Sequence, residues 1–256
     1  MADMQTFLIY RKSPDDKEPR YERFEIPVTK GMSVLDALFY IQDHLDSSLA
    51  FRYSCRGAIC GSCSMTIDQV PMLACRTQVS SVKTTKKPPK LPKFDFGKNP
   101  EWKKENEILI EPLPNMKNRK DLVVDMKPFW RFYKEIRPFF TKKWKENQPE
   151  KKQKIKEINA IEHLVYCILC GLCWSCPINA KNEHYLGPAQ LAKSFRFISD
   201  SRVTSKPRNA ILERVSKDDA VPACKQYFVC NRVCPKGVRP GTAIKHIRDK
   251  WMEDEK

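Results

Sequence analysis

The chain has 256 residues and a formal net charge of +16, because 47 lysines and arginines stand against 31 aspartates and glutamates. This length is enough for one large domain or two ordinary ones. An excess of positive charge attracts nucleic acid, anionic lipid or an acidic partner, but no RNA-binding aromatic motif or helix-turn-helix pattern accompanies it. The opening residues, MADMQTFLIYRK, lack the apolar stretch of a secretion signal, so we expect no export under a signal of the chain's own.

The N-terminal residues alternate between apolar and polar positions, as strands do. Thr6–Arg11 and Tyr21–Val28 are predicted to be strands, with a charged turn at Pro14–Pro19 between them. Ser33 is predicted to cap the following helix, which carries Asp36 in its first turn. The apolar face of that helix consists of Val34, Leu35, Leu38 and Ile41.

Later segments in the N-terminal half are also predicted to be strands. Ser64–Val79 is predicted to form two short strands around Pro71 and to carry Cys75. Ile108–Pro112 is predicted to return as a strand, and Leu122–Met126 to close the domain. Strands, one helix and a cysteine loop together predict a small α+β domain with its cysteines on the rim.

Residues 82–106 interrupt this pattern. They are rich in lysine and proline and poor in aliphatic residues, which favours an exposed excursion over core. We interpret the lysines as a solvated loop, and the alternative is a docking surface for an acidic partner or for lipid headgroups.

From Pro128 onward, apolar residues recur at helical spacing. One such stripe, which we expect to form core or a subunit contact, consists of Phe129, Trp130, Phe132, Tyr133 and Ile136. Further helices are predicted at Lys151–Val165, Pro188–Ser201 and Thr242–Trp251. The change of pattern divides the chain into an α+β domain at residues 1–126 and an all-helical domain at residues 127–256.

Eleven cysteines fall into three spaced runs. The runs are Cys55, Cys60, Cys63 and Cys75; Cys167, Cys170, Cys173 and Cys176; and Cys224, Cys230 and Cys234. So many thiols indicate a reducing compartment, where cysteines bind metal more often than they form disulfides. The odd total fits disulfide pairing poorly, whereas groups of four, four and three suit three clusters.

The first run has the spacing of plant-type [2Fe–2S] ferredoxins, with four and then two residues between successive cysteines. We therefore predict a [2Fe–2S] cluster bound by Cys55, Cys60, Cys63 and Cys75. Gly57 and Gly61 would let the backbone of this loop approach the cluster closely. Zinc is the alternative, because C-x2-C pairs are common in zinc sites, but the longer C-x4-C-x2-C run is not a usual zinc spacing.

The second and third runs follow the pattern of two-cluster ferredoxins, in which the last cysteine of a run ligates the other cluster. This rule predicts a [4Fe–4S] cluster bound by Cys167, Cys170, Cys173 and Cys234. It assigns the remaining cluster to Cys176, Cys224 and Cys230. Tyr227 stands where a fourth cysteine would be, and a phenol is a poor substitute for a thiolate, so we predict a [3Fe–4S] cluster. A four-iron cluster with a water or side-chain ligand is the alternative.

The sequence contains no pattern typical of a catalytic triad, a phosphate-binding loop or a dinucleotide-binding turn. None of the four histidines stands at a metal-binding spacing from a cysteine. We therefore assign no catalytic residue and predict that the chain moves electrons.

Seven strings carry a family resemblance, in the same order across both halves: RYSCRGAICGSCSM, ACRTQV, IEPLPN, DLVVDM, CILCGLC, YLGPAQLAKSFRFISDSR and CPKGVRP. They are similar to the iron–sulfur subunit of succinate dehydrogenase and fumarate reductase. The resemblance implies a β-grasp ferredoxin domain followed by an all-α helical ferredoxin domain. It also implies a [2Fe–2S], [4Fe–4S], [3Fe–4S] relay between a flavoprotein subunit, which holds FAD, and a quinone site at a membrane-anchor subunit.

The resemblance also places Pro177, Lys225 and Arg248 close to the quinone. Ubiquinone-reducing members of the family carry a tryptophan shortly after the cysteine that matches Cys176, and this chain has none there, which favours menaquinone. For Arg248, an ordinary arginine on a helix surface is the equal alternative.

The spacing inside the second cysteine run departs from the family. Only Trp174 and Ser175 separate Cys173 from Cys176, where the family has three residues. The lysine- and proline-rich residues 82–106 also look like an insertion.

These observations predict an electron-transfer subunit of a succinate:quinone oxidoreductase, which would turn over no succinate or fumarate alone. We expect it on the cytoplasmic side of the inner membrane, as a peripheral subunit held by its partners. One alternative is the related subunit of another flavin-linked reductase, acting on thiols or glycolate. The other is a zinc-stabilised basic protein that binds nucleic acid.

Overall fold

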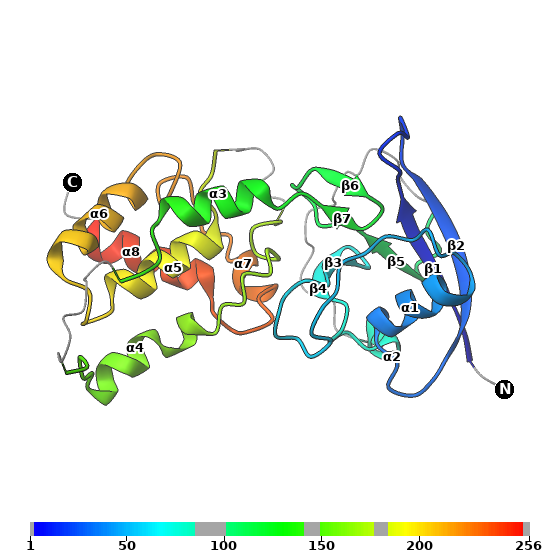
Figure 1. Cartoon of the computed structure of the whole chain (residues 1–256), viewed down its shortest axis with the longest axis horizontal. Coiled ribbons are helices and arrows are strands. Elements are labelled where there is room, and N and C mark those ends of the chain that lie inside the picture. The colour runs from blue at the N-terminus through cyan, green and yellow to red at the C-terminus, as the bar shows by residue number, and fades with distance from the viewer. Residues whose placement is uncertain (1–2, 85–100, 141–148, 177–183, 253–256) are drawn as a thin grey trace. The chain divides into compact units, whose positions relative to one another are not determined.

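The computed structural model describes residues 3–84, 101–140, 149–176 and 184–252 of a chain that forms two compact units (Figure 1). Unit 1 comprises Met1–Met126 and Ile168–Lys181, and unit 2 comprises Lys127–Cys167 and Asn182–Lys256. The domain boundary drawn from the sequence after residue 126 stays a prediction. The grouping of Ile168–Lys181 with unit 1 means that the second cysteine run is divided after Cys167.

Unit 1 is built on a five-stranded mixed sheet with the strand order β2-β1-β5-β3-β4 (Figure 1). Its strands are β1 (Asp3–Arg11), β2 (Arg20–Val28), β3 (Ser64–Ile67), β4 (Val70–Leu73) and β5 (Glu107–Glu111). β1 and β5 are parallel, and the other neighbours are antiparallel. The remaining elements are α1 (Val34–His44), α2 (Val79–Thr84) and a two-stranded sheet of β6 (Asn118–Lys120) and β7 (Val123–Val124).

The core of unit 1 lies where the central strands meet α1. All five residues of β5 are buried, since this strand is paired on both edges. α1 begins as the sequence predicts: the Ser33 hydroxyl accepts the Asp36 N–H at 3.2 Å, and the Asp36 carboxylate accepts the Ser33 N–H at 3.0 Å. The face that α1 buries consists of Val34, Leu35, Ala37, Leu38 and Ile41.

The β3–β4 hairpin corrects one prediction. Its turn lies at Asp68 and Gln69, which have φ values of 46° and 68°, and not at Pro71. Pro71 lies inside β4, opposite Thr66. A proline is tolerated there because β4 is an edge strand of the sheet. Cys75 follows β4 instead of lying on it.

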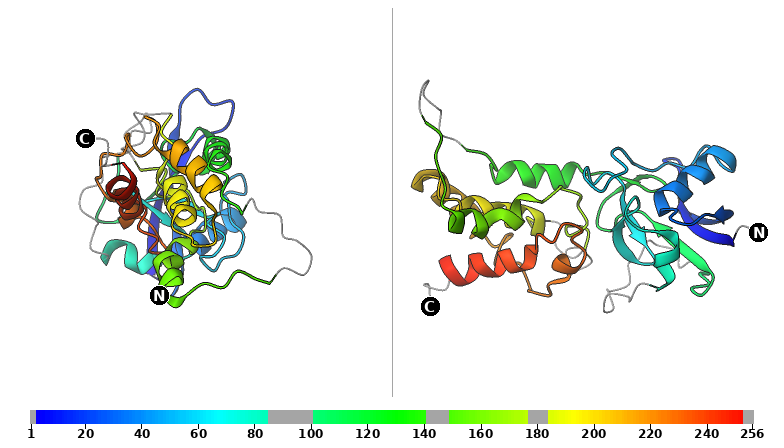
Figure 2. Two further views of the ribbon diagram at one scale, coloured as in Figure 1. Left: turned by 90° about the vertical axis from the view of Figure 1, so that its left-hand side faces the viewer. Right: turned by 90° about the horizontal axis from the view of Figure 1, so that it is seen from below.

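Unit 2 is helical, and its described residues contain no strand (Figure 2). Its helices are α3 (Lys127–Glu135), α4 (Ile155–Val165), α5 (Pro188–Ile198), α6 (Ser205–Val215), α7 (Val229–Arg232) and α8 (Pro240–Trp251). The helices predicted from periodicity correspond to α3, α4, α5 and α8, whereas α6 and α7 were not predicted. α6 buries only Ile211 and Val215, so it carries little apolar periodicity to detect.

The apolar stripe predicted near Pro128 divides between core and surface. Phe129, Phe132 and Ile136 are buried, but Trp130 remains 40% exposed. Among the described residues, no helix combines the length and the apolar character needed to cross a membrane.

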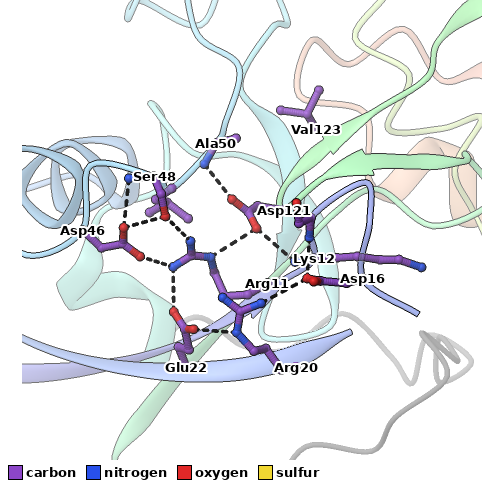
Figure 3. A network of polar contacts seen from close by, with 12 residues as sticks. Arg11, Lys12, Asp16, Arg20, Glu22, Asp46, Ser48, Ala50, Asp121 and Val123 are labelled. Atoms are coloured by element: carbon purple, nitrogen blue, oxygen red, sulfur yellow. Dashed lines mark hydrogen bonds and ion pairs between the residues drawn. The ribbon is translucent and has the colours of Figure 1, made fainter. Parts of the chain in front are cut away.

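A buried arginine holds the end of β1 in place (Figure 3). Arg11 is 2% exposed, and its guanidinium pairs with Glu22 at 2.6 Å, with Asp121 at 3.2 Å and with Asp46. Arg11 also donates to the Ser48 hydroxyl at 2.8 Å. Hydrogen bonds from Ser48 and then from Arg11 lower the pKa of Asp46 to about 2. This network joins β1, β2 and the loop that follows α1.

Asp121 extends the same network through backbone groups. Its carboxylate accepts the N–H groups of Lys12 at 3.0 Å and Ala50 at 2.9 Å, and its own N–H donates to the Lys12 carbonyl at 2.8 Å (Figure 3). Because Asp121 lies between β6 and β7, it fastens this small sheet to the main sheet of unit 1.

Replacement of Arg11 by methionine is expected to destabilise the chain by about 3–5 kcal/mol, because it leaves the buried carboxylate of Asp121 and the partly buried carboxylates of Glu22 and Asp46 without their counter-charge. The matched control is Arg20→Met, since Arg20 pairs with Asp16 and Glu22 but its side chain is 52% exposed. That control is expected to cost about 0–1 kcal/mol. Urea unfolding followed by circular dichroism measures both, and equal losses would contradict the role assigned to Arg11.

Glu107 and Glu111 lie at opposite ends of β5, and their pKa values shift in opposite directions. Burial raises the pKa of Glu111 to about 7, against a hydrogen bond that it accepts from Tyr21 at 2.7 Å. Glu107 is also buried, but hydrogen bonds from Arg23 and the Lys103 backbone outweigh burial and lower its pKa. The folded state therefore favours a protonated Glu111 and an ionised Glu107.

Glu111→Gln is expected to raise the free energy of unfolding above pH 7 and to change it little below pH 4.5. The folded pKa of Glu111 lies above its ordinary value of 4.5, so its stabilising contribution is complete below that value and is lost as the pH rises through about 7. Glu107→Gln is the matched control and is expected to destabilise at pH 7. Urea unfolding at several pH values would contradict the assignment if the two variants behaved alike.

Candidate iron–sulfur centres

The first cysteine run forms a loop whose backbone N–H groups converge on sulfur. Gly57, Ile59 and Cys60 donate to the Cys55 sulfur at 3.3, 3.3 and 3.2 Å. Cys55 and Ser62 donate to the Cys60 sulfur at 3.4 and 3.5 Å. Such donors stabilise negative charge on sulfur, as an iron-bound thiolate requires.

Residues in the left-handed backbone conformation make these N–H groups converge on sulfur. Arg56, Ala58 and Gly61 have φ values of 55°, 57° and 72°. Residues of positive φ among right-handed ones turn successive N–H groups toward one point, which makes an anion-binding concavity. Of these three residues, only Gly61 is of a type that favours positive φ, so the left-handed conformations of Arg56 and Ala58 could not be predicted from the sequence.

The fourth cysteine of this run lies on the buried side of the loop. The Cys75 N–H donates to the Cys63 sulfur at 3.5 Å, and Cys63 is buried whereas Cys55 and Cys60 are exposed. Burial, together with the neighbouring Cys75 and Cys60, raises the pKa of Cys63 to about 12 against the opposing hydrogen bond from the Cys75 backbone. At Cys60, hydrogen bonds from Ser62 and Cys55 outweigh burial and lower the pKa to about 6. The donor set fits a [2Fe–2S] cluster, and the assignment of these four ligands stays a prediction.

The loop of the first run contacts the second run directly. A Cβ atom on Gly61 would lie 2.7 Å from the Cβ atom and 2.8 Å from the Cα atom of Cys170, both within unit 1. No side chain fits at that distance, so only glycine satisfies both the positive φ and the contact. Two predicted ligand loops are therefore in van der Waals contact.

The second run turns tightly after Cys170. Leu169 and Gly171 have φ values of 54° and 79°, and the Gly171 carbonyl accepts the N–H groups of Trp174 and Ser175 at 3.0 and 2.9 Å. This short turn is where the chain departs from the family spacing. Cys173 and Cys176 are buried at its end.

Asn115 fixes the end of this turn within unit 1. Its side-chain amide donates to the carbonyls of Ser175 at 3.3 Å and Cys176 at 2.6 Å. Asn115 belongs to the string IEPLPN, but this contact was not predicted from the sequence. Its φ of 61°, which asparagine tolerates better than most residues, directs the chain past the turn.

In unit 2, Cys167 and Cys234 pack against one apolar group, which consists of Leu164, Ala192, Val238 and Ala243. The Cys234 sulfur accepts the Val238 N–H at 3.4 Å. The prediction gave both cysteines to the [4Fe–4S] cluster, and unit 2 holds them on the same core. Their grouping with Cys170 and Cys173 stays a prediction, since these two belong to unit 1.

The third run places Cys224 and Cys230 close enough to interact electrostatically. Burial and then the charge of Cys224 raise the pKa of Cys230 to about 12, and a hydrogen bond from the Gly241 backbone opposes the shift. Tyr227 between them is 61% exposed. Among the described residues, no group of three or more histidine, cysteine, aspartate or glutamate side chains is arranged to hold a metal ion.

The three residues predicted to lie near a quinone have different environments. Pro177 lies outside the described residues. Lys225 is exposed, whereas Arg248 is half-buried and donates from Nη2 to the carbonyls of Val221 and Cys224, both at 2.8 Å. This contact of Arg248 was not predicted from the sequence, because its acceptors are backbone atoms.

Comparison with known proteins identifies iron–sulfur domains in two segments of the chain. Residues 6–131 match the family described as a 2Fe-2S iron-sulfur cluster binding domain, and residues 166–239 match the 4Fe-4S dicluster domain. The chain joins a 2Fe–2S domain to a 4Fe–4S dicluster domain. This order makes it an iron–sulfur protein of mixed α/β fold with electron-transfer domains.

Two solved structures share the fold. A chain of the Mycobacterium smegmatis Sdh1 complex in the apo form is 20% identical, with a TM-score of 0.81, and the match covers 100% of this chain and 98% of that one. A hypothetical protein from Helicobacter pylori is 16% identical, with a TM-score of 0.54, and the match covers 97% of this chain and 40% of that one. The resemblance to the iron–sulfur subunit of succinate dehydrogenase is thus confirmed in fold and domain content.

Gly61→Ala is expected to remove most of the [2Fe–2S] cluster, because the added methyl group meets the Cys170 backbone and the residue must keep a φ of 72°. Two controls separate these causes. Gly57→Ala has no positive φ, and its Cβ would meet only the Cys55 carbonyl at 3.7 Å. Gly31→Ala has a φ of 84° but nothing within 4 Å. Iron content and the visible circular dichroism of each variant test this, and full cluster content in Gly61→Ala would contradict it.

Proposed function

We propose that this chain is the iron–sulfur electron-transfer subunit of a succinate:quinone oxidoreductase, acting between a flavoprotein subunit and a quinone site at a membrane-anchor subunit. The contact of Gly61 with Cys170 is the observation that carries the proposal, since it joins the ligand loops of two predicted centres. The fold shared with a chain of the Mycobacterium smegmatis Sdh1 complex supports the choice of complex. In fold terms, we propose that unit 1 contains a β-grasp ferredoxin domain and that unit 2 belongs to a helical ferredoxin domain.

When bound, iron–sulfur clusters supply one-electron carriers. The residues of this chain would hold them and set their environment. Backbone N–H groups that donate to the Cys55 and Cys60 sulfurs would stabilise negative charge on the exposed side of the loop, and the buried Cys63 would shield the other side from water. The exposed side, near Cys55 and Cys60, is the part that a flavoprotein holding FAD could approach.

The third predicted centre defines the other end of the relay. We propose a [3Fe–4S] cluster bound by Cys176, Cys224 and Cys230, with menaquinone favoured as the acceptor nearby. The exposure of Tyr227 supports the vacant ligand position, because a phenol that points to solvent leaves that corner without a protein ligand. We place the complex on the cytoplasmic face of the inner membrane, with this chain held there by its partners.

The decisive experiment is low-temperature electron paramagnetic resonance of the purified complex, oxidised and then reduced, with iron and zinc quantified on the same sample. The proposal expects a [3Fe–4S] signal in the oxidised sample, and [2Fe–2S] and [4Fe–4S] signals after reduction. Zinc without iron would overturn it. A co-purifying flavoprotein that oxidises thiols or glycolate, instead of succinate, would support the electron-transfer role but assign the chain to a different complex.

Tyr227→Cys is expected to convert the [3Fe–4S] signal into that of a second [4Fe–4S] cluster, with one more iron per chain, because a thiolate then stands at the vacant corner. Tyr227→Phe is the matched control and should leave the wild-type signals. Two [4Fe–4S] signals in the wild-type protein would contradict the vacancy.

A further inference from the structure

Arg248 binds the backbone beside a predicted cluster ligand. Its Nη2 donates to the carbonyls of Val221 and Cys224, at 2.8 Å each. The Cys224 N–H also donates to the Val221 carbonyl at 3.1 Å, which closes a turn over these residues. Val221 is 0% exposed, so one end of the turn is fixed in the core and the other is held by the guanidinium.

The first turn of the same helix holds the next cysteine. The Gly241 N–H donates to the Asn231 side-chain oxygen at 2.7 Å, and the Asn231 amide donates to the Thr242 hydroxyl at 3.0 Å. A Cβ atom on Gly241 would lie 3.1 Å from the Cys230 sulfur and 2.9 Å from a Phe228 ring carbon. The backbone of α8 therefore lies directly against Cys230.

These two contacts lie on one face of α8. Arg248 follows Gly241 by seven residues, which is close to two full helical turns, so both positions face the same direction about 10 Å apart along the axis. The segment between Cys224 and Cys230 is thereby held at both ends by one rigid element. Within it, Gln226 and Phe228 both have φ values of 55°, which fixes the unusual course of the chain around Tyr227.

We propose that α8 is the template for the two thiols that unit 2 contributes to the third centre, and that Arg248 is a positioning residue for Cys224. The inference rests on the proposed function only for the identity of that centre. It assigns Arg248 a role different from quinone contact, because both hydrogens of its Nη2 are directed at carbonyl oxygens. A charge-assisted hydrogen bond of this kind is stronger than a neutral one and resists opening of the turn.

The test uses Arg248→Met, Arg248→Lys and the control Lys245→Met in the purified complex. Methionine retains apolar bulk but donates nothing, whereas lysine retains a cation that can donate to two carbonyls. Lys245 is on the same helix and pairs with Asp249, with its side chain 49% exposed. The first measurement is the [3Fe–4S] signal per chain. Arg248→Met is expected to lose most of it, Arg248→Lys to recover part, and Lys245→Met to equal the wild type.

The second measurement is hydrogen exchange of the Cys224 amide, which does not depend on iron. Arg248→Met is expected to exchange roughly tenfold faster or more, because two charge-assisted hydrogen bonds are lost. If that variant does not assemble, the inference predicts intermediate exchange in Arg248→Lys. A full [3Fe–4S] signal and unchanged exchange in Arg248→Met, with only a raised KM for quinone, would overturn the positioning role. A wild-type protein without the [3Fe–4S] signal would instead overturn the proposed centre, and the exchange rates would still decide whether Arg248 holds the turn.

Discussion

Sulfur ligands of an iron cluster carry negative charge, and that charge is costly near a protein core unless donors replace water around it. Here the donors come from the backbone: Cys55, Gly57, Ile59, Cys60, Ser62 and Cys75 each direct an N–H group at a cysteine sulfur. Backbone donors need no side-chain entropy to be held in place, but they require a chain that turns repeatedly through positive φ. The loop can hold this conformation because β3 and β4, which follow it, pair in register from Ser64 to Leu73. The geometry of the first centre thus depends on the sheet.

The strands of the sheet are joined to neighbouring segments by charged side chains, instead of by backbone donors. The buried guanidinium of Arg11 is shared by three carboxylates, those of Glu22, Asp46 and Asp121. Such a network is costly to break and contributes modestly to stability relative to apolar packing, but it fixes which segments meet. The residues it joins lie at the end of β1, in the loop after α1 and between β6 and β7. That loop leads directly to Cys55, so the network also fixes where the cysteine loop begins.

The elements that the sequence predicts well are those whose signal is local. Ser33 with Asp36 marks the start of α1, and the cysteine spacing marks the ligand loops, because both patterns act over a few residues. The predictions are wrong or missing where a feature depends on residues that are far apart in the sequence. Pro71 suggested a turn, but its place on an edge strand is a property of the whole sheet. The contacts of Asn115 with the Cys176 carbonyl and of Arg248 with the Cys224 carbonyl have backbone acceptors, and a backbone acceptor leaves no trace in the residue type.

These distant contacts hold ligand segments in place within each of the two compact units. In unit 1, the Gly61 loop lies on Cys170, and Asn115 holds the end of the turn at Cys176. In unit 2, α8 holds the segment that carries Cys224 and Cys230. A short cysteine run cannot by itself fix the separation between neighbouring centres. Inside unit 1, the contact between Gly61 and Cys170 is a constraint of this kind for two of the predicted ligand loops. The shortened interval between Cys173 and Cys176 ends at a backbone that Asn115 holds from outside the cysteine run, through the Ser175 and Cys176 carbonyls.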